Sequence, residues 1–407
     1  MVRFGYFVPE FPGQTHTFFW RELAALRNLG LDPELVSTRR PPQAIVSHSW
    51  ANEAMAATRY LVPPGPSTLL QMPSVLLQGV RNRGRGGAYG HRPRTPGALG
   101  AWYAVRQAAL AGVGAELAVL ARQREWTHVH VHSCADAALV AMHARRLTGV
   151  PYSLTLHGPL SDYGPRQREK WRHAAFGITI TKALAAEVAI ALDGDLPPVI
   201  DVAPMGVDLS NFSRRRPYRP WAGTGEVRVF ACGRLNPSKG HLDLIAAARL
   251  LVDEGLDMRL TIAGEDEQGG IGYRRELESG IGRAGMRDRV TLLGSVSEED
   301  IRDALETSHV FALASEAEPL GVAIMEAMAM GLPVVVTGAG GVPELVEDGV
   351  HGRLVSPRHP EELASALAEV LGEPSKALHM GAAGRRRIEE SFDSGRSARV
   401  LAARILD

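Results

Sequence analysis

The sequence predicts an α/β protein built from two domains, each a doubly wound parallel sheet with helices on both faces. A chain of 407 residues is long enough for two or three domains of roughly 150 residues. Short β-rich runs alternate with helical stretches throughout the sequence, and this alternation implies parallel strands joined by right-handed crossovers. Several runs end in Gly or Ala-Gly, at the strand ends where ligands approach this architecture.

Each half of the chain contains six predicted strands. Those of the first half are residues 2–8, 33–38, 128–132, 152–158, 176–181 and 198–204. Those of the second half are residues 227–233, 259–264, 289–294, 310–315, 333–337 and 352–356. Stretches of Ala, Leu, Glu and Arg with helical spacing lie between most of them.

These elements predict an N-terminal domain over 1–205, a linker over 206–226 and a C-terminal domain over 227–393. The linker assignment rests on 213–226, which is rich in Arg, Pro and Gly and has no periodicity. A last helix at 394–407 would pack back on the N-terminal domain.

The bulk composition predicts a soluble cytoplasmic protein. Hydrophobic residues make up 45% and charged residues 22%, the formal net charge is zero and the pI is about 7.3, so nucleic acid is not expected as a partner. Two cysteines far apart in sequence imply no disulfide framework. The N-terminus does not have the pattern of a secretory signal, and we expect no stretch to reach the roughly 18 apolar residues of a membrane span.

One basic segment has two open interpretations. Six Arg and His side chains occur within 81–94. They form either a solvated surface loop or a contact for an anionic surface, such as acidic phospholipid or the phosphates of a lipid-linked acceptor.

Two carboxylates, Glu318 and Glu326, bracket the start of a predicted helix. A helix N-terminus attracts phosphate, and Gly321 removes a side chain that would block close approach. Since eight residues of helix span roughly 12 Å, a diphosphate at this end would have one Glu near a sugar and the other near a ribose. The alternative is that Glu318 caps the helix and Glu326 is a solvated helix residue.

A second element, "GRLNPSKG" over 233–240, directly follows a predicted strand. It supplies Arg234 and Lys239, and a diphosphate leaving group needs such positive charge as its bond to a sugar breaks. The alternative is a polar loop with a glycine cap.

Three histidines, His128, His130 and His132, fall on one face of a predicted strand because side chains alternate with a period of two. Three imidazoles on one face can bind zinc. Packed, hydrogen-bonded histidines are the favoured interpretation.

These motifs together resemble the retaining GT-B glycosyltransferases of family four, the group 1 type. Glu318 to Gly352 carries nearly all of the family pattern of two Glu separated by seven residues, followed by "EAMAMGLPVVVTGAGGVPELV", and "GRLNPSKG" matches its "GRL…KG" element. The segments "APMGVDLSNF" (203–212), "AGEDEQGG" (263–270) and "LTLHGPLSDYG" (154–164) also match. The start, "EFPGQTHTFFWREL" (10–23), is similar to that of exopolysaccharide and colanic-acid-type transferases.

The resemblance implies a role for each matching residue. Glu318 would bind donor-sugar hydroxyls, Glu326 the ribose, and Arg234 and Lys239 the diphosphate, while His157 would lie near the donor sugar and acceptor. The remaining donor-binding residues implied are Gly13, Gly233, Leu293, Gly294, Leu320, Gly321 and Val322. The first turn departs from the pattern, because it lacks a doubled glycine and His16 stands where the family has an acid.

The implied fold is GT-B, two Rossmann-like domains facing across a cleft, with 205–226 as a hinge. The implied function is transfer of a sugar from a UDP- or GDP-linked donor, with retention, without cofactor or essential metal, in exopolysaccharide or cell-surface glycan synthesis. The acceptor would be a glycan or a polyprenyl-diphosphate-linked sugar, and the enzyme would be cytoplasmic or peripheral on the inner membrane face. A catalytically silent nucleotide-sugar binder and a GT-B sugar-nucleotide epimerase are the alternatives.

Overall fold

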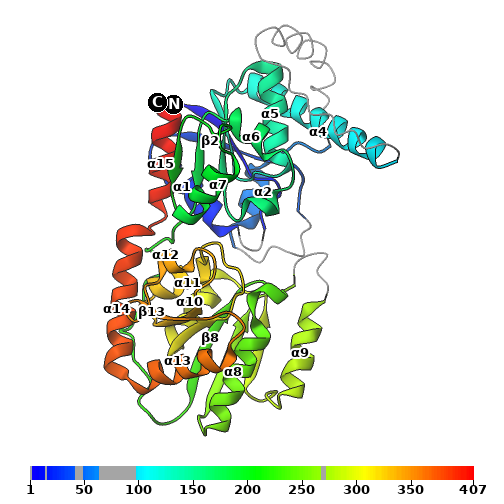
Figure 1. The fold of residues 1–407 in the computed structure, drawn as a ribbon. Helices are drawn as coiled ribbons and strands as arrows, with labels where there is room; N and C mark the ends of the chain where they lie inside the picture. The colour runs from blue at the N-terminus through cyan, green and yellow to red at the C-terminus, as the bar shows by residue number, and fades with distance from the viewer. Residues whose placement is uncertain (1, 14–15, 42–48, 64–97, 267–271) are drawn as a thin grey trace. The chain divides into compact units, whose positions relative to one another are not determined.

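The computed structural model describes residues 2–13, 16–41, 49–63, 98–266 and 272–407. The described chain divides into two compact units (Figure 1). The first unit contains Trp50–Ala203, the described residues before residue 47, and Ser397–Asp407, and the second contains Pro204–Arg396. The segment 206–226 therefore groups with the second unit, and the end of the chain groups with the first.

The first unit is built on a parallel sheet of seven strands. In spatial order the strands are β3 (Arg59–Tyr60), β2 (Asp32–Ser37), β1 (Arg3–Phe7), β4 (His128–Val131), β5 (Tyr152–Leu156), β6 (Gly177–Thr179) and β7 (Ile200–Val202). All six strands predicted for this half are confirmed. The seventh, β3, was missed because a two-residue strand carries no periodic signal.

Helices flank this sheet. They are α1 (Thr17–Asn28), α2 (Ala51–Ala57), α4 (Ala98–Gln123), α5 (Asp136–Thr148), α6 (Gln167–Arg172), α7 (Lys182–Ala191), α15 (Gly395–Leu406) and the short 3₁₀ helix η2 (Leu160–Tyr163). The last helix, α15, is tied to β7 by Arg404, whose guanidinium donates to both carboxylate oxygens of Asp201 at 2.7 and 3.0 Å.

Helix α4 corrects one sequence expectation. Its segment Trp102–Gln123 has a mean hydropathy of 1.4, so by length and composition it is apolar enough to cross a membrane. The helix packs along α5, which is Ala-rich on its buried side, and one end of α4 extends beyond the rest of the unit (Figure 1). Trp102 and Val105 are exposed there.

The second unit is built on a parallel sheet of six strands, all of which were predicted. In spatial order they are β10 (Val290–Gly294), β9 (Met258–Ala263), β8 (Val227–Cys232), β11 (Val310–Leu313), β12 (Val334–Thr337) and β13 (Gly352–Val355). The helices are α8 (His241–Asp253), α9 (Tyr273–Arg283), α10 (Glu298–Thr307), α11 (Val322–Ala329), α12 (Val342–Leu345), α13 (Pro360–Gly372), α14 (Pro374–Ser391) and the 3₁₀ helix η3 (Pro237–Lys239).

Local sequence explains how these elements form. Strands β11 and β12 are continuous apolar runs with every residue buried, as expected where helices cover both faces of a parallel sheet. Helix α10 begins with a capping box, in which Ser297 accepts from the Asp300 N–H and the Asp300 carboxylate accepts from the Ser297 N–H. The predicted class, two doubly wound parallel-sheet domains, is confirmed.

Strand order gives each sheet a switch point. In the first sheet the chain runs outward from β1 in one direction and from β4 in the other, and in the second sheet the same holds for β8 and β11. Ligands of doubly wound sheets bind outside the carboxyl ends of the strands at this point. The loops after β1, β4, β8 and β11 are therefore the places to look for a site.

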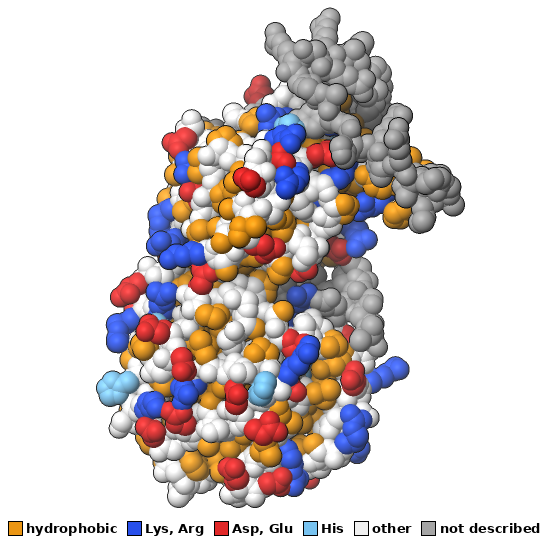
Figure 2. All heavy atoms as spheres, in the orientation of Figure 1, with side chains coloured by type: hydrophobic (Ala, Val, Ile, Leu, Met, Phe, Trp, Pro, Cys, Tyr) orange, Lys and Arg blue, Asp and Glu red, His pale blue; other side chains and the backbone are white. Residues whose placement is uncertain are grey.

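The surface agrees with a formal net charge of zero. On the face shown in Figure 2, acidic and basic side chains are interspersed with hydrophobic ones. The basic segment 81–94 lies outside the described residues.

Candidate active site

The centre of the candidate site in the second unit is an ion pair between Lys239 and Glu318. Lys239 ends η3 in the loop after β8, and Glu318 lies in the loop after β11. Since β8 and β11 are neighbours, their carboxyl ends bring the Lys239 ammonium to 2.5 Å from the Glu318 carboxylate. The Ser315 hydroxyl also donates to Glu318, at 3.2 Å.

Both predicted carboxylates are buried, so the structural alternative for this pair is wrong. Glu318 and Glu326 are each 7% exposed. Glu318 does not cap α11, because Gly321 occupies the N-cap position and no side chain caps it. Glu326 lies inside α11 on its buried side, close enough to Cys232 at the end of β8 to raise the pKa of that thiol together with burial. A buried carboxylate needs a charged or polar partner. For Glu318 these partners are Lys239 and Ser315.

Arg234 adds a second cation at the same strand end. Burial lowers the pKa of its guanidinium, and the nearby Glu318 carboxylate partly offsets that effect. The ring of His241, at the start of α8, contacts the Arg234 carbonyl at 3.2 Å and fixes the course of this loop. Gly233, Arg234 and Lys239 are thus placed together with Glu318, as the sequence predicted.

Two glycines make the close approach of these loops possible. Gly240 has φ +62°, and a Cβ there would lie 1.9 Å from the Ala314 carbonyl oxygen. Gly340 has φ +60°, and its Cβ would lie 2.2 Å from the Glu318 carbonyl oxygen, which accepts from the Gly341 N–H at 3.0 Å. The turn at Gly340 and Gly341 therefore holds the Glu318 backbone in place.

The other predicted donor residues of this unit lie along the same edge of the sheet. Leu320, Gly321 and Val322 lead into α11, whose first N–H groups have no intrahelical acceptor. Gly294 ends β10, and its carbonyl accepts from the Gly264 N–H at 2.8 Å. Leu293 is 43% exposed. The edge therefore presents one apolar side chain, a helix N-terminus and two cations in one unit.

In the first unit His157 belongs to a buried polar chain. It follows β5, and its Nε2 lies 3.3 Å from Nδ1 of His132, which follows β4. Nε2 of His132 lies 3.2 Å from the Glu22 carboxylate, which accepts from the Tyr6 hydroxyl at 2.6 Å. Sequence reasoning missed both residues, although Glu22 falls in the segment 10–23 that is similar to the family and Tyr6 falls in the first predicted strand.

The other two strand histidines pack in the sheet, as the favoured interpretation expected. His128 Nε2 and His130 Nδ1 each lie 2.7 Å from the Ser153 hydroxyl, and both rings stack on Phe176. Burial lowers the pKa of His128 to about 4. Within the described ranges no group of His, Cys, Asp and Glu side chains is arranged to hold a metal ion.

Gly13 lies against a residue at which the sequence departs from the family pattern. A Cβ at Gly13 would meet the His16 imidazole at 2.8 Å, so that ring occupies the space beside the glycine. The His16 ring also stacks on Phe11. In this structure the space beside Gly13 is filled by His16.

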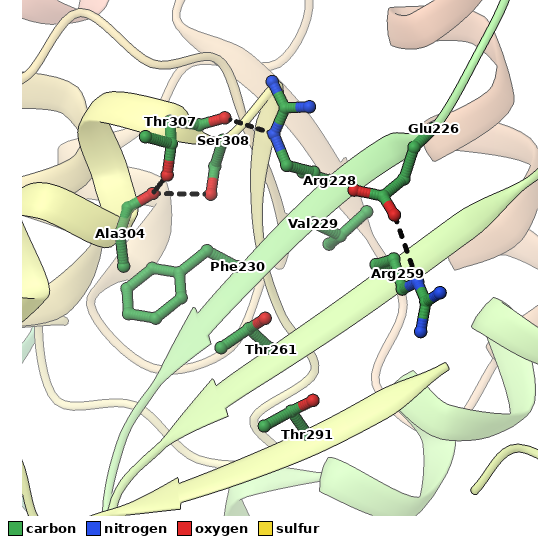
Figure 3. Close-up of a pocket in the computed structure, with 10 residues that line it drawn as sticks. All are labelled: Glu226, Arg228, Val229, Phe230, Arg259, Thr261, Thr291, Ala304, Thr307 and Ser308. Atoms are coloured by element: carbon green, nitrogen blue, oxygen red, sulfur yellow. Dashed lines mark hydrogen bonds and ion pairs between the residues drawn. The ribbon is translucent and has the colours of Figure 1, made fainter. Parts of the chain in front are cut away.

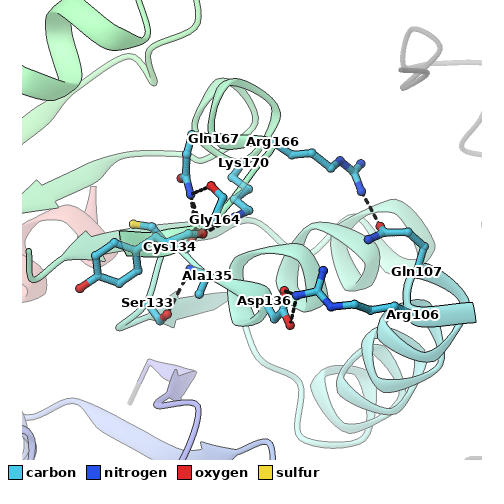
Figure 4. Close-up of polar contacts among 11 residues, drawn as sticks. Arg106, Gln107, Ser133, Cys134, Ala135, Asp136, Gly164, Arg166, Gln167 and Lys170 are labelled. Atoms are coloured by element: carbon cyan, nitrogen blue, oxygen red, sulfur yellow. Dashed lines mark hydrogen bonds and ion pairs between the residues drawn. The ribbon is translucent and has the colours of Figure 1, made fainter. Parts of the chain in front are cut away.

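A clamp joins the loops that follow β4 and β5. Lys170, 1% exposed, donates to the carbonyls of Cys134 and Tyr163 at 2.8 and 3.1 Å. The Gln167 amide donates to the same two carbonyls at 3.1 and 2.8 Å (Figure 4). Burial lowers the Lys170 pKa to about 8. The clamp joins the backbone that follows His132 to the backbone that follows His157.

A separate hollow of about 250 Å³ lies on the second sheet (Figure 3). It is lined by Glu226, Arg228, Arg259, Thr261 and Thr291, among others. Arg228 donates to the Thr307 carbonyl and Arg259 pairs with Glu226. None of the predicted site residues lines it, and its strand residues include those at the amino-terminal ends of β8 and β9, away from the switch-point edge.

Comparison with known proteins gives a family match for this chain. Residues 221–387 match the family model described as Glycosyl transferases group 1. The chain is 30% identical over 327 residues to the 2-deoxystreptamine glucosyltransferase of Streptomyces kanamyceticus, covering 74% of this chain and 81% of that protein. It is 28% identical over 408 residues to the colanic acid biosynthesis glycosyltransferase WcaL of Salmonella typhimurium, covering 93% and 92%.

Solved structures give the same fold. The crystal structure of Anabaena Alr3699/HepE in complex with UDP and glucose superposes with a TM-score of 0.74 over all of both chains at 19% identity. Sucrose-phosphate synthase from Thermosynechococcus elongatus gives 0.74 at 18% identity, covering 99% of this chain and 98% of that one. From the family model, the relatives and the fold together, the chain belongs to the glycosyl transferases group 1 family and is a glycosyltransferase of GT-B type.

Proposed function

We propose that this enzyme transfers a sugar from a nucleotide-diphosphate donor to an acceptor hydroxyl, with retention at the anomeric carbon. The observation that carries the proposal is the buried Lys239–Glu318 pair at the switch point of the second sheet, with Arg234 and Glu326 beside the same strand end. This set offers cations for a diphosphate and carboxylates for sugar and ribose hydroxyls. The Anabaena neighbour of the same fold is solved with UDP and glucose.

The proposed mechanism asks little acid–base chemistry of the protein. The bond from the anomeric carbon to the β-phosphate oxygen breaks, and a bond from that carbon to the acceptor oxygen forms on the same face. The acceptor proton passes to the departing phosphate oxygen, so no protein base is needed. Lys239, Arg234 and the N–H groups at Leu320, Gly321 and Val322 would stabilise the charge on the leaving diphosphate.

The same proposal assigns the remaining substrate contacts. Glu318 would bind donor-sugar hydroxyls once Lys239 turns to the phosphate, and Glu326 would bind the ribose. Leu293 and Gly294 would lie against the base. His157 and Gly13, in the first unit, would lie near the sugar and acceptor, and no metal or cofactor takes part.

The acceptor belongs to the same proposal. The likeness to the WcaL protein over nearly the whole chain favours a glycan or polyprenyl-diphosphate-linked sugar in exopolysaccharide synthesis. An enzyme with such an acceptor would work in the cytoplasm, peripherally on the inner face of the membrane, and an anionic membrane surface would then be a partner.

The donor is tested by thermal-shift titration of the purified protein against UDP, GDP and ADP and their common sugar conjugates. A ligand that binds only the folded state raises the apparent stability, by about 2.7 kcal/mol at a hundred times Kd. We expect one nucleotide to raise Tm, and expect Glu326→Ala and Lys239→Ala to abolish that rise. Leu378 is an exposed residue on α14. Leu378→Ala serves as the matched control and should retain the rise in Tm with nucleotide.

The reaction is tested by turnover with the donor that the titration identifies. Glu318→Ala and Lys239→Ala should each lower kcat by at least a hundredfold, since Glu318 would position the donor sugar and Lys239 would stabilise the charge that develops on the leaving diphosphate. Near-wild-type rates in both variants would contradict the assignment of Glu318 and Lys239 to the donor site. A product that forms without any acceptor would indicate an epimerase instead.

A further inference from the structure

We propose that Glu22 and His132 are positioning residues that hold His157 in one tautomer, with its proton on Nε2 and a lone pair on Nδ1. The inference rests on the proposed function, because that function places His157 beside the sugar and acceptor. It assigns a role to two side chains of the first unit that the reaction mechanism did not use.

The geometry is a chain of four side chains from three strands and a helix. Tyr6 on β1 donates to Glu22 on α1 at 2.6 Å. The Glu22 carboxylate lies 3.2 Å from His132 Nε2, close in distance without the alignment of a hydrogen bond. His132 Nδ1 lies 3.3 Å from His157 Nε2. Tyr6, Glu22 and His132 are 0%, 6% and 4% exposed. Solvent therefore does not screen the electrostatic interactions among these three side chains.

The Glu22 carboxylate selects the tautomers. With a proton on His132 Nδ1, the electron-rich, unprotonated Nε2 would lie 3.2 Å from the carboxylate, which is electrostatically unfavourable. With the proton on Nε2, the partial positive charge of the N–H lies near Glu22, and Nδ1 keeps a lone pair toward His157, so His157 donates from Nε2. A neutral imidazole carries one proton, and Nδ1 of His157 is then an acceptor.

The enclosure of the His157 Nδ1 atom supports the same assignment. This nitrogen is enclosed and has no hydrogen-bond partner among the described residues. A buried N–H without an acceptor is rarer in proteins than an acceptor without a donor. Burial also lowers the pKa of both His132 and His157 to about 3, which keeps both rings neutral.

The surroundings hold the rings in place. The Phe19 ring contacts His132 and His157 edge-on, at centroid distances of 4.8 and 5.4 Å. His130 and His16 are the other titratable groups that act on this pair, and each disfavours a further positive charge there. The network thus fixes ring orientation and proton position together, so the His157 ring is held in one orientation with its proton on Nε2.

The direct test is long-range ¹H–¹⁵N correlation NMR on the full-length protein labelled at histidine. Each ring nitrogen reports whether it carries a proton. We expect His157 to be protonated on Nε2 and unprotonated on Nδ1. The opposite pattern, with the proton on Nδ1, would overturn the proposal, because it would mean that His132 donates from Nδ1 and that the Glu22 carboxylate does not select its tautomer.

Matched variants separate positioning from folding. Glu22→Gln keeps shape and removes the charge, and it should mix the His157 tautomers and lower kcat by about tenfold, a loss of the size found when the partner that orients a metal-binding histidine is removed. His132→Gln offers His157 an amide oxygen and Glu22 an amide N–H, and should recover most of the kcat that His132→Phe loses. His128→Gln, on the same strand but bonded to Ser153, should leave the His157 nitrogen signals unchanged.

Nucleotide binding distinguishes this inference from the proposed function. The donor diphosphate is assigned to the second unit, so Glu22→Gln should keep the wild-type thermal shift with nucleotide and an unchanged donor KM. A normal shift with unaltered kcat and unaltered His157 tautomer would overturn the positioning role alone. Loss of the nucleotide response in the wild-type protein would instead overturn the proposed function.

Discussion

Lys239 and Glu318 stabilise each other in the absence of ligand. Their side chains are 13% and 8% exposed, and removing one partner of such a buried pair leaves an uncompensated charge. Each side chain is therefore tied to the fold as well as to the proposed chemistry. A loss of activity in either variant has to be interpreted beside its loss of stability.

Breaking this pair should lower stability in a non-additive way. Lys239→Met or Glu318→Gln alone should lower the free energy of unfolding of the second unit by about 3 kcal/mol. The double variant should cost clearly less than the two single losses together, because no unpaired charge remains. Urea unfolding followed by circular dichroism measures all three, and strictly additive losses would contradict the coupling.

The loop glycines are the second residue-scale feature. Gly240→Ala should destabilise the second unit by at least about 3 kcal/mol, because a Cβ 1.9 Å from the Ala314 oxygen requires a backbone shift in addition to left-handed strain of about 1–2 kcal/mol. Gly255 has φ +95° and open space around it, so Gly255→Ala should cost only the strain. Equal urea midpoints for the two variants would argue against the steric contact.

At the scale of elements, α15 closes the first unit although it is the last segment of the chain. Ala398, Leu401 and Ala402 are buried, and Arg404 pairs with Asp201 on β7. The apolar side of the helix provides most of the attachment, because a half-exposed ion pair contributes little.

Deletion of residues 397–407 should therefore destabilise the first unit by several kcal/mol, while Arg404→Ala should cost less than about 1 kcal/mol. Tryptophan fluorescence reports on this unit, since all tryptophans except Trp221 belong to it. The nucleotide-induced thermal shift should survive the deletion in the second unit. An unchanged midpoint of unfolding, followed by tryptophan fluorescence, would show that the first unit does not need α15 for its stability.

At the scale of the whole molecule, buried neutral histidines make stability depend on pH. Burial lowers the pKa of His128 and His241 to about 4 and of His132 and His157 to about 3. The unfolded chain protonates these groups near pH 6.5. The folded state therefore binds fewer protons below that pH, and its stability is fully present above pH 6.5 and falls as the pH drops toward the folded values.

Each of these histidines should lower the free energy of unfolding by roughly 2 kcal/mol at pH 5 relative to pH 7. The combined loss from four histidines is large beside a total stability of about 5–15 kcal/mol. Tm should fall steeply between pH 6.5 and 5. The decline should be steeper by tryptophan fluorescence, since three of the four histidines lie in the first unit. His128→Gln should make Tm depend less steeply on pH. A Tm that does not change with pH would contradict the prediction.

Much of the candidate site could be predicted because its signals are local. Arg234 and Lys239 lie within one loop, and Glu318 and Glu326 lie eight residues apart. Glu22 and Tyr6 could not be predicted as partners of His132, because they are 110 and 126 positions away from it in the sequence. Their meeting depends on β1 and β4 being neighbours, and no local pattern encodes strand order.

The sequence by itself determined every strand except the two-residue β3, the two sheets and the family, because apolar periodicity and glycine turns act over a few residues. Only the tertiary structure decided that Lys239 pairs with Glu318 and that the Gly340 turn holds the Glu318 backbone. It also decided that His16 fills the space beside Gly13. The series of side-chain contacts from Tyr6 to His157 likewise appears only in the folded structure. The physical reason is that these contacts join loops from different strands. Their geometry follows from the packing of a whole sheet rather than from any single segment.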